Sequence, residues 1–138
     1  MLNSLENEVK DIILDKLKTA ENNFTPSYGC DFNYSLFECE NIDGTFFYCT
    51  YESKEFLKRN FDYLGEIYQQ LMDEFDFDFA AKAALDFFDN PDRFACIVIL
   101  TVAENLLNQL QFISDNWDNE IEFNSENIAK IINELHAL

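Results

Sequence analysis

Residues 90–113 carry the strongest hydrophobic pattern of the chain, and this pattern predicts the central helix of the fold. Asn90 can cap such a helix, and the fixed φ angle of Pro91 suits its first turn. Residues 94–100 are apolar on every side, whereas the apolar positions after them form one stripe with Glu, Asn and Gln opposite. We therefore expect a helix near 91–112 that is enclosed by protein over its first half and solvated on one side over its second.

Apolar residues recur at helical spacing in two stretches before this helix. Residues 3–20 predict a first helix, whose acidic residues come early and whose lysines come late, in agreement with the helix dipole. The pattern from residue 53 to residue 75 is helical again, and Asn60 or Gly65 is expected to break or kink it.

Two shorter helices complete the pattern. Residues 80–88 are rich in strong helix formers, and Pro91 ends that helix because the residue before a proline is pushed out of the α region. Ser125 can cap a last helix, in which the apolar residues between 128 and 135 form the stripe.

The stretch 30–50 allows two structures. Aromatic and β-branched residues lie on both sides of Asp43-Gly44, a pair that favours a tight turn, so a short β-hairpin near 36–50 is one of them. Two short helices are the other, with Tyr48 at the start of the second. The pattern does not choose between these structures.

Polar residues typical of loops separate the predicted helices at 21–29 and at 114–125. No internal repeat and no change of composition divides the chain. The pattern therefore predicts a mainly α protein, a single domain over residues 1–138 that is built as a compact helical bundle around the helix near 91–112.

Composition supports a folded chain with a strong negative charge. Of the 138 residues, 48% are hydrophobic and 16% are aromatic, which is enough to bury a core. The 27 Asp and Glu residues outnumber the 9 Lys and Arg residues, for a formal net charge of -18. Because acidic disordered segments contain few aromatic residues, we expect this charge to coat a folded domain.

The charge favours a basic protein surface as partner and argues against nucleic acid or an anionic membrane. No basic residue lies between Arg93 and Lys130 to neutralise phosphates. The first residues lack the positive charge of a signal peptide, and the apolar run 94–103 is about half a membrane span in length. We therefore expect a protein of the cytoplasm; the sequence does not indicate its oligomeric state.

Residues typical of active sites and metal sites are scarce. The only histidine, His136, lies near the end of the chain, where fraying is normal, and the glycines are scattered singly. The cysteines Cys30, Cys39, Cys49 and Cys96 contain no C-x-x-C pair for zinc, so we expect thiols, with Cys96 buried. The acidic stretches do not match the calcium-binding EF-hand loop. The sequence therefore predicts no catalytic residue, no metal, no cofactor and no enzyme activity.

Acidic residues gather between positions 60 and 92, where nine acids accompany a single base, Lys82. On a helix, Asp62, Glu66 and Asp73 fall within about 40° of one another, at axial steps of roughly 6 and 10 Å. Duplex DNA carries about one negative charge per 3.4 Å on each strand, so such a row can enter a site built for phosphates. The predicted partner-binding residues are Asp62, Glu66, Asp73, Glu74, Asp76, Asp78, Asp86 and Asp89.

Two alternatives stay open for this region. A charged helix face is also typical of an ordinary solvated surface, and an acidic exterior can serve solubility alone. The aromatic residues of this region are expected in the core: Phe75, Phe77, Phe79, Phe87 and Phe88. The alternative is that one of them, such as Phe77, is exposed and anchors an interface with a rim of carboxylates.

Two segments of the chain, 28–37 (YGCDFNYSLF) and 51–57 (YESKEFL), are similar to small uncharacterised phage proteins. The small size, the acidity and the many Asn and Phe residues also resemble phage and mobile-element proteins that block bacterial defence, such as anti-CRISPR and DNA-mimic antirestriction proteins. This resemblance implies a stoichiometric inhibitor of a nucleic-acid-binding defence protein in a bacterial cell. The alternative is a small structural or adaptor protein that self-associates through an aromatic surface.

Overall fold

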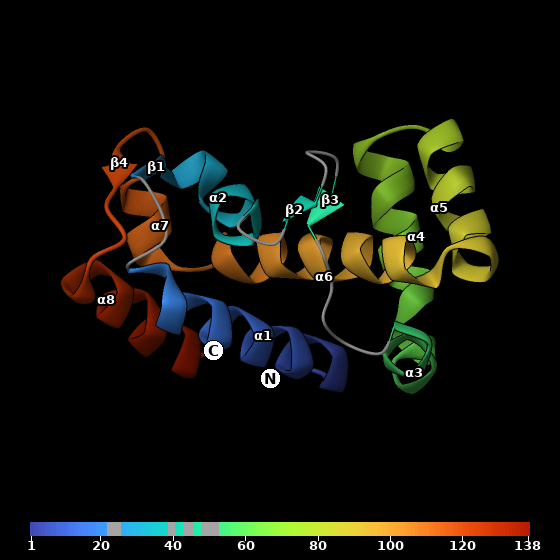
Figure 1. Cartoon of the computed structure of the whole chain (residues 1–138), viewed down its shortest axis with the longest axis horizontal. Helices are drawn as coiled ribbons and strands as arrows, with labels where there is room; N and C mark the ends of the chain where they lie inside the picture. The colour runs from blue at the N-terminus through green and yellow to red at the C-terminus, as the bar shows by residue number, and fades with distance from the viewer. Residues whose placement is uncertain (22–25, 39–40, 43–45, 48–52) are drawn as a thin grey trace. The chain divides into compact units, whose positions relative to one another are not determined.

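The computed structural model of the chain describes residues 1–21, 26–38, 41–42, 46–47 and 53–138. Helices α1 to α8 contain most of these residues, and each strand that accompanies them is two residues long (Figure 1). The predicted mainly α fold is therefore confirmed.

Two compact units make up the chain. Unit 1 consists of Met1–Cys39 with Val102–Leu138, and unit 2 consists of Glu40–Thr101. Helix α6 (Pro91–Leu107) begins in unit 2 and ends in unit 1. The single domain predicted over residues 1–138 stays a prediction.

Helix α1 (Ser4–Ala20) in unit 1 confirms the first predicted helix. Asn3 and Glu6 form a capping box at its start. The Asn3 side chain accepts a hydrogen bond from the Glu6 N–H at 2.8 Å, and the Glu6 carboxylate accepts one from the Asn3 N–H at 3.0 Å. The apolar side of α1 is buried, and helix α8 (Ser125–His136) packs along α1 (Figure 1).

Unit 1 also contains a pair of strands that the pattern missed. Strand β1 (Ser27–Tyr28) pairs antiparallel with β4 (Glu120–Ile121), and both lie in segments expected to be connectors. Two residues are too few to show an alternating pattern, and the partners are far apart in the sequence. A single 3-10 turn, η1 (Gly29–Asp31), follows β1.

The stretch 30–50 combines parts of both predicted structures. Helix α2 (Phe32–Glu38) occupies residues expected in the first hairpin strand. Strand β2 (Asn41–Ile42) then pairs antiparallel with β3 (Phe46–Phe47), which confirms strand pairing inside the predicted hairpin at 36–50. The expected turn at 43–44 lies outside the described residues.

Unit 2 contains α3 (Ser53–Arg59), α4 (Phe61–Glu74), α5 (Phe77–Asp89) and the first part of α6. The chain turns between α3 and α4 at Asn60, so the predicted break is here and not at Gly65, which lies inside α4. Asn60 is buried, and its side-chain amide donates a hydrogen bond to a carbonyl one turn earlier in α3 at 2.9 Å. Helices α4 and α5 pack against each other (Figure 1).

Helix α6 begins as predicted but is shorter than the helix expected near 91–112. The Asn90 side chain accepts a hydrogen bond from the Arg93 N–H at 3.3 Å, and α6 starts at Pro91. The helix ends at Leu107, and a turn leads into the short helix α7 (Gln111–Asp115). Of the residues predicted to be enclosed at 94–100, those at 94–99 are buried and Leu100 is half-buried.

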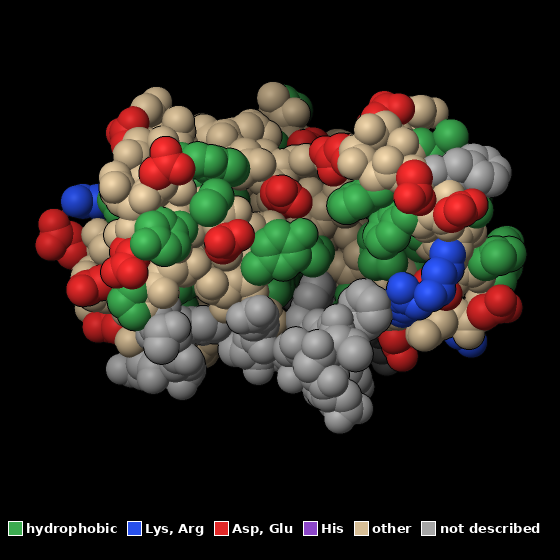
Figure 2. All heavy atoms as spheres, turned by 90° about the horizontal axis from the view of Figure 1, so that it is seen from above, with side chains coloured by type: hydrophobic (Ala, Val, Ile, Leu, Met, Phe, Trp, Pro, Cys, Tyr) green, Lys and Arg blue, Asp and Glu red, His purple; other side chains and the backbone are tan. Residues whose placement is uncertain are grey.

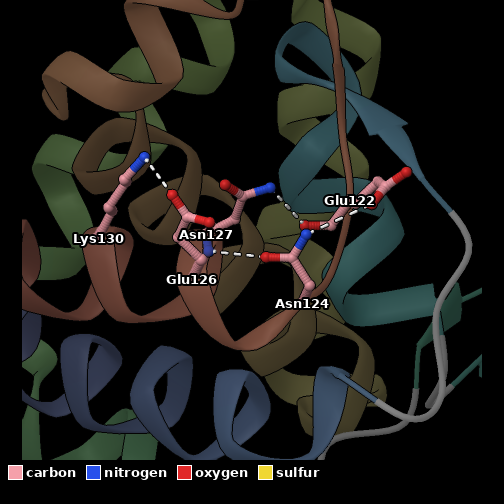
Figure 3. A network of polar contacts seen from close by, with 5 residues as sticks. All are labelled: Glu122, Asn124, Glu126, Asn127 and Lys130. Carbon is pink, nitrogen blue, oxygen red and sulfur yellow. Dashed lines mark hydrogen bonds and ion pairs between the residues drawn. The ribbon is translucent and has the colours of Figure 1, made fainter.

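The last helix, α8, is capped by Asn124 and not by Ser125 (Figure 3). The Asn124 side chain accepts a hydrogen bond from the Asn127 N–H at 2.9 Å and donates one to the Glu122 carboxylate at 3.4 Å. The Asn127 amide in turn donates to the Glu122 carbonyl at 3.0 Å. Ser125 instead donates a hydrogen bond from its hydroxyl to the Glu21 carboxylate.

Candidate functional site

Helix α4 carries buried and acidic residues on opposite sides. Its buried side consists of Leu64, Ile67 and Leu71. Its solvent side carries three exposed acids, Asp62, Glu66 and Asp73. At 100° per residue these acids lie within about 40° of one another, roughly opposite the buried side. We call these three residues the acidic row.

The acidic row has no basic residue on its own helix, because α4 contains neither Lys nor Arg. Side-chain amides accompany the acids instead: Gln69 donates a hydrogen bond to Asp73 at 3.1 Å, and Gln70 donates one to Glu74 at 2.9 Å. A Cβ atom added to Gly65, between the first two acids of the row, would meet nothing within 4 Å. The row is therefore open to solvent and charged along its length.

The other predicted site residues in unit 2 lie at or beyond the end of α4. Glu74 is exposed in the last turn. Asp76 caps α5, since its carboxylate accepts a hydrogen bond from the Phe79 N–H at 2.7 Å. Asp78 and Asp89 are exposed on one face of α5, and the helical spacing places Lys82 between them. A base thus accompanies the acids of α5 but not those of α4.

Asp86 differs from the other predicted site residues. Its side chain is only 13% exposed and forms an ion pair with Arg93 of α6, whose side chain is 23% exposed, at a distance of 3.3 Å. An enclosed and paired carboxylate presents little charge to a partner. Asp86 therefore belongs to the packing of α5 on the start of α6, and not to the open acidic surface.

Acidic side chains are not confined to unit 2. On the face drawn in Figure 2 they lie among hydrophobic and other side chains over both units. In unit 1, ion pairs connect Lys18 with Asp15 at 3.6 Å and Lys130 with Glu126 at 3.4 Å. The acidic row is distinguished by its alignment on a helix without bases, and not by a concentration of all the charge on one face.

Several aromatic residues that were expected in the core are exposed. Phe75, Phe79 and Phe88 are exposed, and Phe87 is half-buried. The Phe75 and Phe79 rings contact each other with centroids 4.6 Å apart. The side chain of Phe77 lies outside the described residues. Helix α5 is apolar around most of its circumference, so α4 and the start of α6, which contact it, leave part of its apolar surface uncovered.

A pocket of about 280 Å³ in unit 2 lies beside these aromatic residues and was not predicted. Its lining residues are Lys54, Leu57, Lys58, Phe61, Phe87, Phe88 and Pro91. The sequence signal that could have indicated an exposed apolar site here is the composition of α5. This helix has more apolar side chains than one packed face of a helix can bury.

Among the described residues, no cluster of three or more His, Cys, Asp or Glu side chains could hold a metal ion. Cys96 is buried, as predicted, and Cys30 is exposed, whereas Cys39 and Cys49 lie outside the described residues. Desolvation and the neighbouring Asp31 carboxylate raise the pKa of the Cys30 thiol. A raised pKa keeps the thiol neutral, which is the opposite of an activated nucleophile.

The parts of the chain that the structure describes include no helix of the length and apolarity that a membrane crossing requires.

No known protein family, curated protein or solved structure matches this chain. The geometry of the chain itself must therefore support any functional assignment.

Proposed function

We propose that this protein is a non-enzymatic acidic binding protein that inhibits a nucleic-acid-binding protein by occupying its basic surface. The acidic row is the observation that supports this function. Asp62, Glu66 and Asp73 are exposed on the solvent side of one helix, and that helix contains no base. Because the helix is already packed through its opposite side, little conformational entropy is lost from its backbone on binding.

The spacing of the row suits a surface that binds phosphates. The axial steps between its acids are about 6 and 10 Å, or roughly two and three times the 3.4 Å that separates charges along a DNA strand. Lys and Arg side chains that bind a DNA strand can therefore reach successive carboxylates. The exposed acids Glu74, Asp78 and Asp89 add to the negative field that attracts a basic partner.

The partner in this proposal is a bacterial defence protein that binds nucleic acid, such as a nuclease, and the proposed site of action is the cytoplasm of the bacterial cell. The inhibitor itself binds neither nucleic acid nor membrane. Its formal net charge of -18 repels phosphates and anionic lipids.

Capture from a bacterial lysate tests the proposed function. The immobilised chain should retain a basic nucleic-acid-binding protein at 0.1 M salt and release it at 1 M, because the screening length falls from about 10 Å to about 3 Å. Added duplex DNA should compete with the immobilised chain for that protein. If neither salt nor added DNA reduced the amount of retained protein, the proposal that the chain mimics DNA would be contradicted.

Charge reversal locates the binding surface. The variant Asp62→Lys/Glu66→Lys/Asp73→Lys should lose the captured partner while its circular dichroism stays helical. A matched control reverses the same number of exposed acids in unit 1: Asp11→Lys/Asp118→Lys/Glu120→Lys. The control should keep the partner. Equal loss in both variants would mean that total charge matters and the acidic row does not.

Self-association through an aromatic surface is the alternative function, and the exposure of Phe61, Leu85 and Phe88 favours it. The negative charge of each copy opposes it. Light scattering at low and high salt separates the two functions. A monomer in both conditions supports the inhibitor, whereas a dimer that Phe88→Ser dissociates supports the adaptor.

A further inference from the structure

The pocket in unit 2 lies where four helices meet. Helix α3 contributes Lys54, Leu57 and Lys58, α4 contributes its first residue, α5 contributes its last two aromatic residues, and α6 contributes Pro91. All of these elements belong to unit 2, or to the part of α6 that begins in it.

The wall of the pocket is aromatic and is anchored in the core. The Phe87 ring contacts Phe61 and Phe88 edge to face, with centroids 6.1 and 4.9 Å apart. Phe87 also contacts the buried ring of Phe94, with centroids 5.7 Å apart. A ring held by three neighbours has little freedom to collapse into the pocket.

The apolar surface continues outside the pocket. Phe61 is 61% exposed, Phe88 is 81% exposed, and Leu85, one turn before Phe88 on α5, is 63% exposed. Single exposed apolar residues are common on protein surfaces, but a pocket bordered by large ones is typical of an interaction site.

Two lysines give the edge of this pocket a positive charge. Lys54 and Lys58 are one turn apart on α3, both are exposed, and both line the pocket. Neither forms an ion pair with another residue in the described part of the chain. In a chain with 27 acids and 9 bases, two unpaired lysines beside one apolar pocket are unexpected. They complement a carboxylate next to an apolar group.

The size of the pocket selects the kind of ligand. Pockets for small molecules and cofactors usually measure about 300–1,000 Å³. This pocket, with about 280 Å³, lies at the small end of that range and is open to solvent. It suits one large side chain of a protein partner, and aromatic side chains that insert into pockets of this kind often dominate an interface.

We propose that this pocket binds an aromatic side chain in an acidic segment of a partner protein, whose flanking carboxylates pair with Lys54 and Lys58. The pocket and the acidic row share no residue, although Phe61 of the pocket directly precedes Asp62 of the row. The pocket proposal does not depend on the proposed inhibition. The acidic row attracts a basic surface, whereas the pocket selects an aromatic residue between acids.

Peptide binding to the full chain tests this site. The probe is the peptide Ac-Ala-Glu-Trp-Glu-Ala-amide. It is titrated into the nitrogen-15-labelled protein, and nuclear magnetic resonance detects its binding. The amide signals of residues 54–61 and 87–88 should shift on titration. A peptide with Lys in place of both Glu residues should bind about tenfold more weakly, and a peptide with Ala in place of Trp should not bind measurably.

Variants of the protein separate the contribution of the two lysines from that of the aromatic wall. Lys54→Gln/Lys58→Gln should abolish the preference for the Glu peptide but leave weak Trp-dependent binding. Phe88→Ala should weaken binding of both Trp peptides. Lys82→Gln removes a positive charge from α5 outside the pocket lining and should leave binding unchanged.

Four results would overturn the proposal. These are no shift at millimolar peptide, equal affinity for the Glu and Lys peptides, shifts confined to other residues, and concentration-dependent shifts of residues 54–61 without peptide, which would show a second copy in the pocket. The variant Glu66→Lys/Asp73→Lys leaves Asp62, the neighbour of Phe61, unchanged and should keep peptide binding intact. Failure of the pocket proposal is therefore distinguishable from failure of the proposed inhibitor function.

Discussion

The carboxylate of Glu134 in α8 accepts hydrogen bonds from the backbone N–H groups of Gln111 at 2.7 Å and of Phe112 at 3.0 Å. These N–H groups open α7, where Leu110 at the cap position offers no side-chain acceptor. Glu134, which is distant in the sequence, thus caps the five-residue helix α7 and connects it to α8.

Replacement Glu134→Ala should lower the free energy of unfolding by about 1–2 kcal/mol, because the first N–H groups of α7 lose their acceptor. Urea denaturation followed by circular dichroism measures the change. Glu126→Ala is a matched control on the same helix, since its exposed ion pair with Lys130 should contribute less than about 1 kcal/mol. Equal destabilisation by both variants would refute the role of Glu134 as a cap.

Two glycine-to-alanine replacements should have opposite effects on stability. A Cβ atom at Gly29 would lie 2.6 Å from the carbonyl oxygen of Asn116, a backbone atom that has little room to move, so Gly29→Ala should destabilise by about 1–3 kcal/mol. Gly65 is exposed inside α4, and an added Cβ atom would have open space around it, so Gly65→Ala should stabilise by about 1 kcal/mol.

The same urea denaturation, applied to both glycine variants, measures this contrast. The Gly65→Ala variant keeps all three acids of the row and should retain the partner captured from lysate. A stabilising Gly29→Ala would show that the contact with Asn116 relaxes without cost.

Replacement Asp86→Ala should destabilise unit 2 by about 1–3 kcal/mol, because it leaves the largely buried Arg93 guanidinium without this carboxylate. Asp89→Ala, on the same helix but exposed, should change stability by less than about 0.5 kcal/mol. Thermal unfolding of the two variants provides the comparison. If Asp89→Ala proved the more damaging, the assignment of Asp86 to helix packing would be wrong.

Cys30 should react slowly with iodoacetamide although it is exposed. Its raised pKa lowers the thiolate fraction at any pH below that pKa, and only the thiolate reacts. Replacement Asp31→Asn removes a negative neighbour, so it should lower the pKa and speed alkylation at neutral pH. Peptide mass spectrometry follows Cys30 individually, and the buried Cys96 should stay unmodified in the folded chain. An unchanged rate in the Asp31→Asn variant would exclude the electrostatic explanation.

Helices with a continuous apolar stripe were predictable because their pattern is local. The helix over 3–20, the start of α6 at Pro91 and the solvent-facing alignment of Asp62, Glu66 and Asp73 follow from the 3.6-residue period and from capping residues. The acidic row could therefore be placed on one helix face from its spacing alone. Its role in binding stays a prediction.

Features that depend on distant contacts were not predictable in this way. The helix predicted near 91–112 ends at Leu107, and Glu134 supplies the acceptor for the helix that follows. The pairing of β1 with β4 also depends on residues far apart in the sequence, and neither strand has a pattern of its own.

The amino-acid sequence by itself determined a mainly helical, strongly acidic chain and the side of α4 that faces water, because neighbouring residues on a helix hold fixed angles to one another. Only the tertiary structure decided which carboxylates stay open, with Asp86 enclosed beside Arg93, and which aromatic residues stay outside the core. The pocket beside Lys54 and Lys58 arose in the same way. Burial depends on how much surface the neighbouring elements cover, and that surface is set by contacts between residues distant in the chain.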